Sequence, residues 1–256
     1  MVTTPVEIDE AVLNERRDRV FLALAGTFLC AMTLLNVVGI TRFIQLGPMS
    51  LAVGVLPYPL TFLCTDLICE LYGRRRANYM VTVGLCLNFF ILGVLYLGNI
   101  MPAVAADTQP PWQTLQLAND VMLPNGEIAT GSVEFFDLIY ATTSGAVVAS
   151  MMAYIAAQYA DVKLFHFWKR ITKGKHLWIR NNFSTLISQM VDSFMVITVT
   201  FGASLIDGRL GLAAFFTLMF SNYLFKMMAA LMDTLPFYFL VKKLSLYLQI
   251  DTMKVD

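Results

Sequence analysis

Long apolar stretches alternate with short polar segments along most of the chain. Six of these stretches reach about 20 residues, the number that an α-helix needs to cross the roughly 30 Å hydrocarbon core of a bilayer. They lie near residues 20–40, 51–72, 77–101, 133–158, 183–206 and 212–241. The pattern predicts an all-α integral membrane protein. Its six-helix domain covers residues 20–243, between an N-terminal tail (1–19) and a C-terminal tail (244–256).

The composition agrees with a protein whose main partner is the lipid bilayer. Of the 256 residues, 57% are hydrophobic and 14% are charged, which is too apolar for a soluble domain with a solvated surface. The formal net charge is +0, from 18 basic and 18 acidic residues, and gives no support for binding to nucleic acid. The first apolar stretch follows an acidic tail and lacks a small-residue cleavage site, so we do not expect a cleaved signal peptide.

Basic residues are distributed unevenly between the connecting segments. They precede the first stretch, follow the second and the sixth, and lie between the fourth and fifth, at Arg16, Arg17, Arg19, Arg74, Arg75, Arg76, Lys163, Lys169, Arg170, Lys173, Lys175, Arg180, Lys242, Lys243 and Lys254. The other connections carry only Arg42 and Arg209. Because basic loops stay in the cytoplasm, this distribution predicts that both termini are cytoplasmic. The run at 73–76 is then a topology determinant, and a role at an anion or a helix end is the alternative.

The segment from Pro102 to Ser132 is extracytoplasmic in this topology and contains no basic residue. We expect a loop with an interfacial helix around Trp112 to Leu123. The segment is either a lid or a plain connector.

Pro57 and Pro59 lie within the second predicted helix. Each lacks a backbone donor and strains the preceding turn, so we expect the helix to kink or break there. A broken helix would free backbone groups for substrate binding, whereas a kink would only fit the helix around its neighbours.

Polar side chains interrupt the fifth and sixth apolar stretches. Asp192 and Lys226 lie at similar depths near the middle of their helices, counted at about 1.5 Å per residue, and we expect them to pair. A charge within the bilayer should face a protein interior or a wet cavity, which favours function over a structural ion pair. Gln189 and Asn222 share the helix faces of these two residues at spacings of three and four.

The first three apolar stretches carry further polar groups. Asn36 and Asn88 are neutral amides that either join helices or contact a ligand. Asp66 and Glu70 lie four residues apart on one face of the second predicted helix, just before the arginines. We expect them to point into the bundle, as the inner gate or lower wall of a substrate path.

Signatures of enzymes and metal sites are missing from the sequence. The four cysteines fall inside predicted helices without a paired-thiol spacing, and His166 and His176 both lie in one basic segment. Neither a disulfide framework nor a zinc site is indicated, and a histidine box or serine nucleophile elbow is not found. We expect no metal, no cofactor and no catalytic residue.

Three segments, TDLICELYGRRRA, QMVDSFMVITVTF and LFKMMAALMDTLPFYFLVK, resemble the queuosine precursor transporter family, which is also grouped with vitamin uptake transporters. The resemblance implies a six-helix inner-membrane importer of 7-deazaguanine bases, namely the cyano or aminomethyl precursors or queuine, for salvage into the tRNA wobble nucleoside. Carried onto this chain, the motifs fall on Asp66, Glu70, Arg75 or Arg76, Asp192 and Lys226.

The chemistry of the cargo agrees with such a site. A guanine-like edge offers an N–H beside an exocyclic amine, which one carboxylate accepts with both oxygens, while a lysine or an amide serves the adjacent carbonyl. The substrate-binding residues that we predict are Asn36, Asp66, Glu70, Asn88, Gln189, Asp192, Asn222 and Lys226. Gating or topology is assigned to Pro57, Pro59, Arg74, Arg75 and Arg76.

Three helices on either side of the long segment predict a 3+3 inverted repeat, because an odd number of crossings inverts the second half. A standalone secondary carrier, which proton coupling would drive, competes with a substrate-binding membrane subunit of an ATP-driven uptake system. An intramembrane enzyme is a third, less favoured hypothesis. A homodimer and an energising module stay open as partners.

Overall fold

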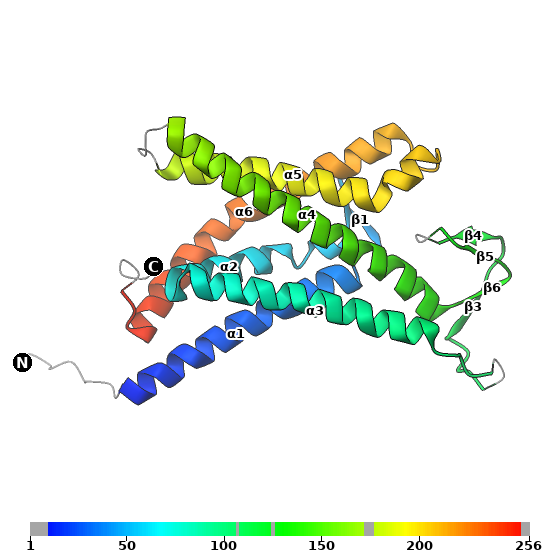
Figure 1. The fold of residues 1–256 in the computed structure, drawn as a ribbon, viewed down its shortest axis with the longest axis horizontal. Helices are drawn as coiled ribbons and strands as arrows, with labels where there is room; N and C mark the ends of the chain where they lie inside the picture. The colour runs from blue at the N-terminus through cyan, green and yellow to red at the C-terminus, as the bar shows by residue number, and fades with distance from the viewer. Residues whose placement is uncertain (1–9, 106–107, 124–125, 172–176, 252–256) are drawn as a thin grey trace, which may run out of the picture. The chain divides into compact units, whose positions relative to one another are not determined.

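The computed structural model describes residues 10–105, 108–123, 126–171 and 177–251 (Figure 1). The described part is mostly helical, with α1 (Glu10–Val37), α2 (Tyr58–Tyr72), α3 (Arg74–Ile100), α4 (Phe135–Ile171), α5 (Leu177–Ile206) and α6 (Leu212–Leu248). With the 3-10 turn η1 (Val53–Val55) counted at the start of α2, all six are long and apolar enough to cross a membrane. The prediction of six membrane helices is confirmed for this part of the chain.

Several helices extend beyond the predicted bounds. α1 begins ten residues before residue 20, and α6 continues to Leu248. The predicted spans 133–158 and 183–206 agree with the candidate spans Phe135–Ala157 and Leu186–Ile206, but their helices continue into the connection, since α4 runs to Ile171 and α5 begins at Leu177. The sequence from Tyr159 to Ile171 contains no glycine or proline to end a helix. Part of the basic segment is therefore helical, while Lys173, Lys175 and Lys254 lie outside the described residues.

The second span is interrupted at its prolines, as the prediction of a kink or a break requires, because η1 ends at Val55 and α2 begins at Tyr58. Pro57 is the N-cap of α2 and Pro59 lies in its first turn. The N–H groups of a first turn have no acceptor within the helix, so proline loses nothing there. Pro236 lies in the interior of α6.

A β-hairpin precedes α2, so the fold is not purely helical. β1 (Phe43–Leu46) pairs antiparallel with β2 (Met49–Ala52), with Phe43 opposite Ala52 and Leu46 opposite Met49. Gly47 in the two-residue turn has φ +58, a conformation that glycine adopts without steric cost. Residues 51 and 52, predicted as the start of the second membrane helix, therefore belong to β2.

The long segment after α3 forms strands instead of the predicted interfacial helix. β3 (Thr114–Gln116) pairs with β6 (Ser132–Glu134), and β4 (Val121–Met122) pairs with β5 (Ile128–Ala129), both antiparallel. Polar and apolar residues alternate from Thr114 to Leu117, a period of two that suits a strand and not a helix. Leu123, Val133 and Ala141 form a small core that joins this segment to the start of α4.

The chain divides into two compact units. Unit 1 comprises Met1–Thr33, Pro57–Gly84 and Ala229–Asp256, and unit 2 comprises Leu34–Leu56 and Leu85–Met228. This division does not follow the two halves of the predicted inverted repeat, which stays a prediction.

The core of unit 1 joins α1, α2 and α3. Phe28 of α1 packs with Cys64 and Ile68 of α2 and with Ala77 and Met80 of α3. α2 ends at Tyr72, and its C-cap Gly73 has a φ of +86 that lets α3 begin at the next residue.

Unit 2 contains α4 and α5, which lie side by side (Figure 1). The β1–β2 hairpin packs against α5 and α6 in the same unit. The rings of Phe43 and Phe201 are 5.8 Å apart between centroids, and a small core of Met49, Leu51 and Val55 contacts Leu224 and Phe225 of α6. The hairpin therefore packs against the part of α6 that carries Asn222 and Lys226.

Candidate functional site

α5 and α6 bring two opposite charges together inside unit 2. The ammonium of Lys226 donates to Oδ2 of Asp192. The side chains of Lys226 and Asp192 are 4% and 14% exposed, so both charges are largely removed from solvent. The predicted pairing is confirmed.

The connection between the two helices sets the depth of this pair. Asp192 lies fourteen residues before the end of α5 at Ile206, and Lys226 lies fourteen residues after the start of α6 at Leu212. At about 1.5 Å per residue, each charge is roughly 21 Å from the connection. That depth lies well within a hydrocarbon core of roughly 30 Å.

Buried polar atoms without a hydrogen-bond partner flank the ion pair. Among the described residues they include Oε1 of Gln189, Oγ of Ser193 and Nδ2 of Asn222. Ser193 is 1% exposed and Asn222 is 6% exposed. Leaving such an atom unsatisfied costs about 1–3 kcal/mol, so each of them favours a polar ligand or water.

We refer to Gln189, Asp192, Ser193, Asn222 and Lys226 as the α5–α6 polar cluster. Gln189 lies three residues before Asp192 on α5, and Asn222 lies four residues before Lys226 on α6. Because the two helices are joined by a short turn and run in opposite directions, Gln189 and Asn222 lie on opposite sides of the ion pair. The cluster thus presents amide, carboxylate and ammonium groups in a row.

This set of groups suits a planar, nitrogen-rich molecule. A carboxylate accepts two adjacent N–H groups, a lysine ammonium donates to carbonyl or ring acceptors, and an amide does either. Among the described residues, no group of three or more histidine, cysteine or acidic side chains is arranged to hold a metal ion. Recognition of a polar organic cargo is the chemistry that the cluster supports.

Asn36 and Asn88 form a second polar contact in unit 2. Nδ2 of Asn36 donates to Oδ1 of Asn88 at 3.0 Å, and the two residues are 1% and 2% exposed. Nearby, the hydroxyl of Thr143 on α4 donates to the carbonyl of Val37 at 3.2 Å. These bonds join the end of α1 to α3 and α4. Thr143 was not predicted, because a single threonine in a long apolar helix carries no signal of its partner.

Asp66 and Glu70 share one face of α2, and both are exposed in the structure. The neighbouring Leu67 and Ile68 are 1% and 0% exposed and form the packed face of the helix. Within unit 1, Asp66 interacts electrostatically with Asp233 of α6. One carboxylate oxygen of Asp233 is buried without a hydrogen-bond partner. Acidic groups of two helices therefore meet in this unit.

Basic residues collect where four helix ends of unit 1 meet. Nε of Arg17 on α1 donates to the carbonyl of Leu248 at 3.1 Å, and the hydroxyl of Tyr72 donates to the carbonyl of Arg17 at 2.8 Å. The guanidinium of Arg76 lies 5.6 Å from the ring centroid of Tyr72. The beginnings of α1 and α3 and the ends of α2 and α6 are thus at one end of the unit. Arg75 is exposed, and the side chain of Arg74 lies outside the described residues.

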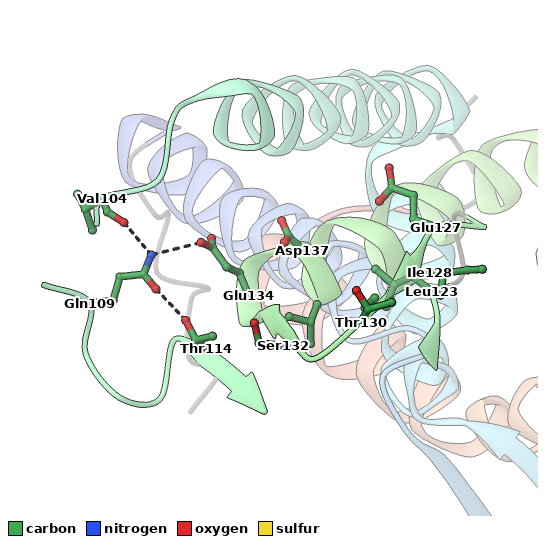
Figure 2. Close-up of a pocket in the computed structure, with 12 residues that line it drawn as sticks. Val104, Gln109, Thr114, Leu123, Glu127, Ile128, Thr130, Ser132, Glu134 and Asp137 are labelled. Carbon is green, nitrogen blue, oxygen red and sulfur yellow. Dashed lines mark hydrogen bonds between the residues drawn. The ribbon is translucent and has the colours of Figure 1, made fainter. Parts of the chain in front are cut away.

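A cavity of about 500 Å³ lies between the long segment and the start of α4 (Figure 2). Nε2 of Gln109 donates to Oε1 of Glu134 at 3.2 Å and to the carbonyl of Val104 at 3.0 Å. The hydroxyl of Thr114 donates to Oε1 of Gln109 at 2.8 Å. Carboxylates of Glu127, Glu134 and Asp137 line the cavity, and its lining contains no basic residue. These bonds order one wall of the cavity.

The helices and the α5–α6 polar cluster define a multi-pass membrane protein with a charged site among its helices. A model of the family described as "Putative vitamin uptake transporter" matches residues 52–241, and the chain belongs to this family of transporters. The match extends from the end of β2 through most of α6 and includes the whole cluster.

A curated relative from Bacillus subtilis (strain 168) is called "Probable queuosine precursor transporter". It is 25% identical over 210 residues, which cover 80% of this chain and 77% of the relative. No solved structure matches the chain. The resemblance predicted from the three sequence motifs is confirmed by these comparisons.

Proposed function

We propose that the protein imports 7-deazaguanine bases, the precursors of queuosine, across the bacterial inner membrane. Both termini lie in the cytoplasm in this proposal, which places the basic end of unit 1 on the cytoplasmic side. The family assignment and the name of the relative support the class of cargo. Imported bases would supply the salvage route to queuosine in tRNA.

The α5–α6 polar cluster carries the proposal. A buried ion pair contributes little net stability, because desolvation of both charges offsets their attraction. Ionisable groups within membrane helices mark substrate pathways more often than structural contacts. Asp192 would accept the ring N–H and the exocyclic amine of the base, and Asn222 or Lys226 would donate to its carbonyl. Asn36 donates to Asn88 and would join the helices that line the path.

Uptake by reconstituted protein tests this function. Purified chain in liposomes is expected to accumulate radiolabelled 7-deazaguanine bases, and Asp192→Asn should abolish the accumulation. A control variant at an exposed lysine, Lys242→Ala, should transport as the wild type does. Absence of uptake of every deazaguanine, while the same protein imports an unrelated vitamin, would refute the proposal.

The same vesicles separate the mechanisms. A standalone carrier transports without another protein, and proton coupling makes the rate depend on an imposed pH gradient. If uptake requires an added ATP-hydrolysing module, the chain is the substrate-binding subunit of a larger system. Recovery of a chemically altered base from the vesicles would instead favour an enzyme.

Asp66 and Glu70 are proposed to form the cytoplasmic gate of the path. Their exposed carboxylates lie on one face of α2, and that of Asp66 interacts with Asp233, so they can contact a polar cargo or the water that surrounds it. We expect the double variant Asp66→Ala/Glu70→Ala to reduce uptake about tenfold, or ~1.4 kcal/mol, with little effect on the melting temperature. Uptake at the wild-type rate would exclude the gating role.

A further inference from the structure

Two amide side chains of the α5–α6 polar cluster offer unused hydrogen-bonding groups of opposite kind. Oε1 of Gln189 is a buried acceptor and Nδ2 of Asn222 is a buried donor, and neither atom has a hydrogen-bond partner among the described residues. Asn222 is 6% exposed, so it is largely removed from solvent. Because an unsatisfied buried donor or acceptor is unfavourable, the two atoms favour a ligand that donates at one end and accepts at the other.

The two amides lie at different levels along their helices. Gln189 is seventeen residues before the end of α5, and Asn222 is ten residues after the start of α6. At about 1.5 Å per residue, their levels differ by about 10 Å, with the ion pair between them. A hydrogen bond spans about 3 Å between its heavy atoms, so two such bonds leave room between the amides for one edge of a flat ring system.

Asp192 and Lys226 can stay paired while a base binds. Lys226 donates to Oδ2 of Asp192 and has a further interaction as well. A carboxylate has about four acceptor sites on its two oxygens, so it can accept from the ammonium, from the ring N–H and from one N–H of the exocyclic amine together. The second N–H of the amine and the carbonyl oxygen of the base then still need partners, at opposite ends of the same edge.

We propose that Gln189 and Asn222 are specificity-determining residues that fix the orientation of the base at Asp192. The exocyclic amine donates its second N–H to Oε1 of Gln189, and the carbonyl of the base accepts from Nδ2 of Asn222. The carbonyl end of the base therefore points toward the turn between α5 and α6. This inference rests on the proposed function, and it assigns the carbonyl to Asn222 because Lys226 already has its own partners.

Two analogues of 7-deazaguanine isolate the two contacts. 7-Deazahypoxanthine lacks the exocyclic amine. 6-Thio-7-deazaguanine keeps the amine and the ring N–H but replaces the carbonyl oxygen by sulfur, which is a weaker acceptor. The dissociation constant of each analogue is measured by competition with radiolabelled 7-deazaguanine for the detergent-solubilised protein.

Gln189→Leu removes the acceptor with little change in volume. We expect it to weaken binding of 7-deazaguanine and of the thio analogue roughly tenfold, the upper range for one hydrogen bond between neutral groups. Binding of 7-deazahypoxanthine should change little, because this base has no amine to lose. The preference of the protein for 7-deazaguanine over 7-deazahypoxanthine therefore falls about tenfold.

Asn222→Leu removes the donor and should give the complementary pattern. We expect roughly tenfold weaker binding of 7-deazaguanine and of 7-deazahypoxanthine, which both carry the carbonyl. Binding of the thio analogue should change little. If either amide had only a structural role, its variant would weaken binding of all three bases equally.

Thr198→Val is the matched control, because Oγ1 of Thr198 is also buried without a partner on α5 but lies outside the cluster. It should leave the binding of all three bases at the wild-type level. The melting temperatures of the leucine variants without a base should be unchanged or raised, because each substitution removes a buried polar atom that has no partner. If a leucine variant does not fold, Gln189→Met or Asn222→Ala removes the same atom and takes its place.

The outcomes separate the two proposals. If the wild type binds none of the three bases, the proposed function fails. If the wild type binds them but the variants lose nothing, or lose equally for all three, the orientation is refuted while the function stands. An exchanged pattern, in which Gln189→Leu spares the thio analogue and Asn222→Leu spares 7-deazahypoxanthine, also refutes it, because the base would then lie the other way round.

Discussion

Two buried polar pairs in unit 2 join membrane helices, but they differ in charge. Asn36 and Asn88 share a neutral hydrogen bond of 3.0 Å between α1 and α3. Asp192 and Lys226 share a charged contact between α5 and α6, and unsatisfied atoms flank it. Each amide pair in a membrane protein contributes only about 0.6 kcal/mol on average, so the first pair can be explained by packing alone. The second pair lacks such an explanation.

The comparison indicates which polar residues of a membrane helix deserve a functional hypothesis. Burial alone does not distinguish the two pairs, since all four residues are largely buried. Unfilled hydrogen-bonding capacity does not distinguish them either, since Oδ1 of Asn36 is also buried without a partner. Charge does distinguish them, because Asp192 and Lys226 are an ion pair and the amides are neutral. A transporter needs groups that can change partners, and the α5–α6 polar cluster is where such groups lie.

The largest effect should come from removing one charge of the ionic pair. Lys226→Met leaves the carboxylate of Asp192 buried without a counter-charge, which costs ~3–5 kcal/mol. We expect a large fall in melting temperature and loss of uptake, measured in detergent and in liposomes. In the double variant Asp192→Asn/Lys226→Met the melting temperature should largely recover while uptake stays absent. If the double variant transports, the Asp192–Lys226 pair has a structural role, as the amide pair does.

A smaller effect is expected from crowding the region of the amide pair. Gly54 of η1 packs so closely that an added Cβ would lie 2.7 Å from Cα of Gly39 and 2.7 Å from the carbonyl oxygen of Leu35. Gly54→Ala should destabilise the protein by about 1–3 kcal/mol through overpacking. The melting temperature checks this, with Gly93→Ala as control, because a Cβ there meets no atom within 4 Å.

Replacing both amides should cost still less. Asn36→Leu/Asn88→Leu removes both partners together, so no unsatisfied group is left, and we expect a change in stability of within about 1 kcal/mol. Uptake should stay within about threefold of the wild type, which is less than 1 kcal/mol. Loss of uptake at an unchanged melting temperature would show that the amides contact the cargo and would remove the distinction between the two pairs.

The smallest effect concerns the hydroxyl that supports the amide pair. Thr143→Val keeps the shape of the side chain and removes its 3.2 Å bond to the carbonyl of Val37. The expected loss is about 0.5–1.5 kcal/mol, the net worth of one hydrogen bond. Uptake should not change. Thr217→Val on α6, where the hydroxyl is exposed and bonds within its own helix, serves as the control in the same melting experiment.

The helices and the ionic pair could be predicted from the sequence because both follow from local counting. A run of about 20 apolar residues needs no tertiary information to be read as a membrane helix. Depth along a helix is also a count of residues, and this count predicts that Asp192 and Lys226 lie at the same depth. The partner of Asn36 could not be predicted this way, because it depends on how α1 and α3 are rotated.

The wrong predictions share a different physical cause. Apolar strands of the β1–β2 hairpin directly precede α2, so residues 51–52 read as part of one continuous apolar run. That run placed Pro57 and Pro59 inside the predicted helix, whereas Pro57 is the N-cap of α2 and Pro59 lies in its first turn. Short strands in the long segment were missed because their partners, such as Thr114 and Glu134, are about 20 residues apart.

The turn between α5 and α6 has a consequence for how this protein can vary. Since Asp192 and Lys226 meet only because equal lengths of helix separate them from that turn, adding or deleting one residue on either side would rotate a charge by about 100° around its helix axis. Substitutions of one apolar side chain for another along these stretches leave that alignment intact. Related chains should therefore tolerate changes of sequence between these charges far better than changes of length.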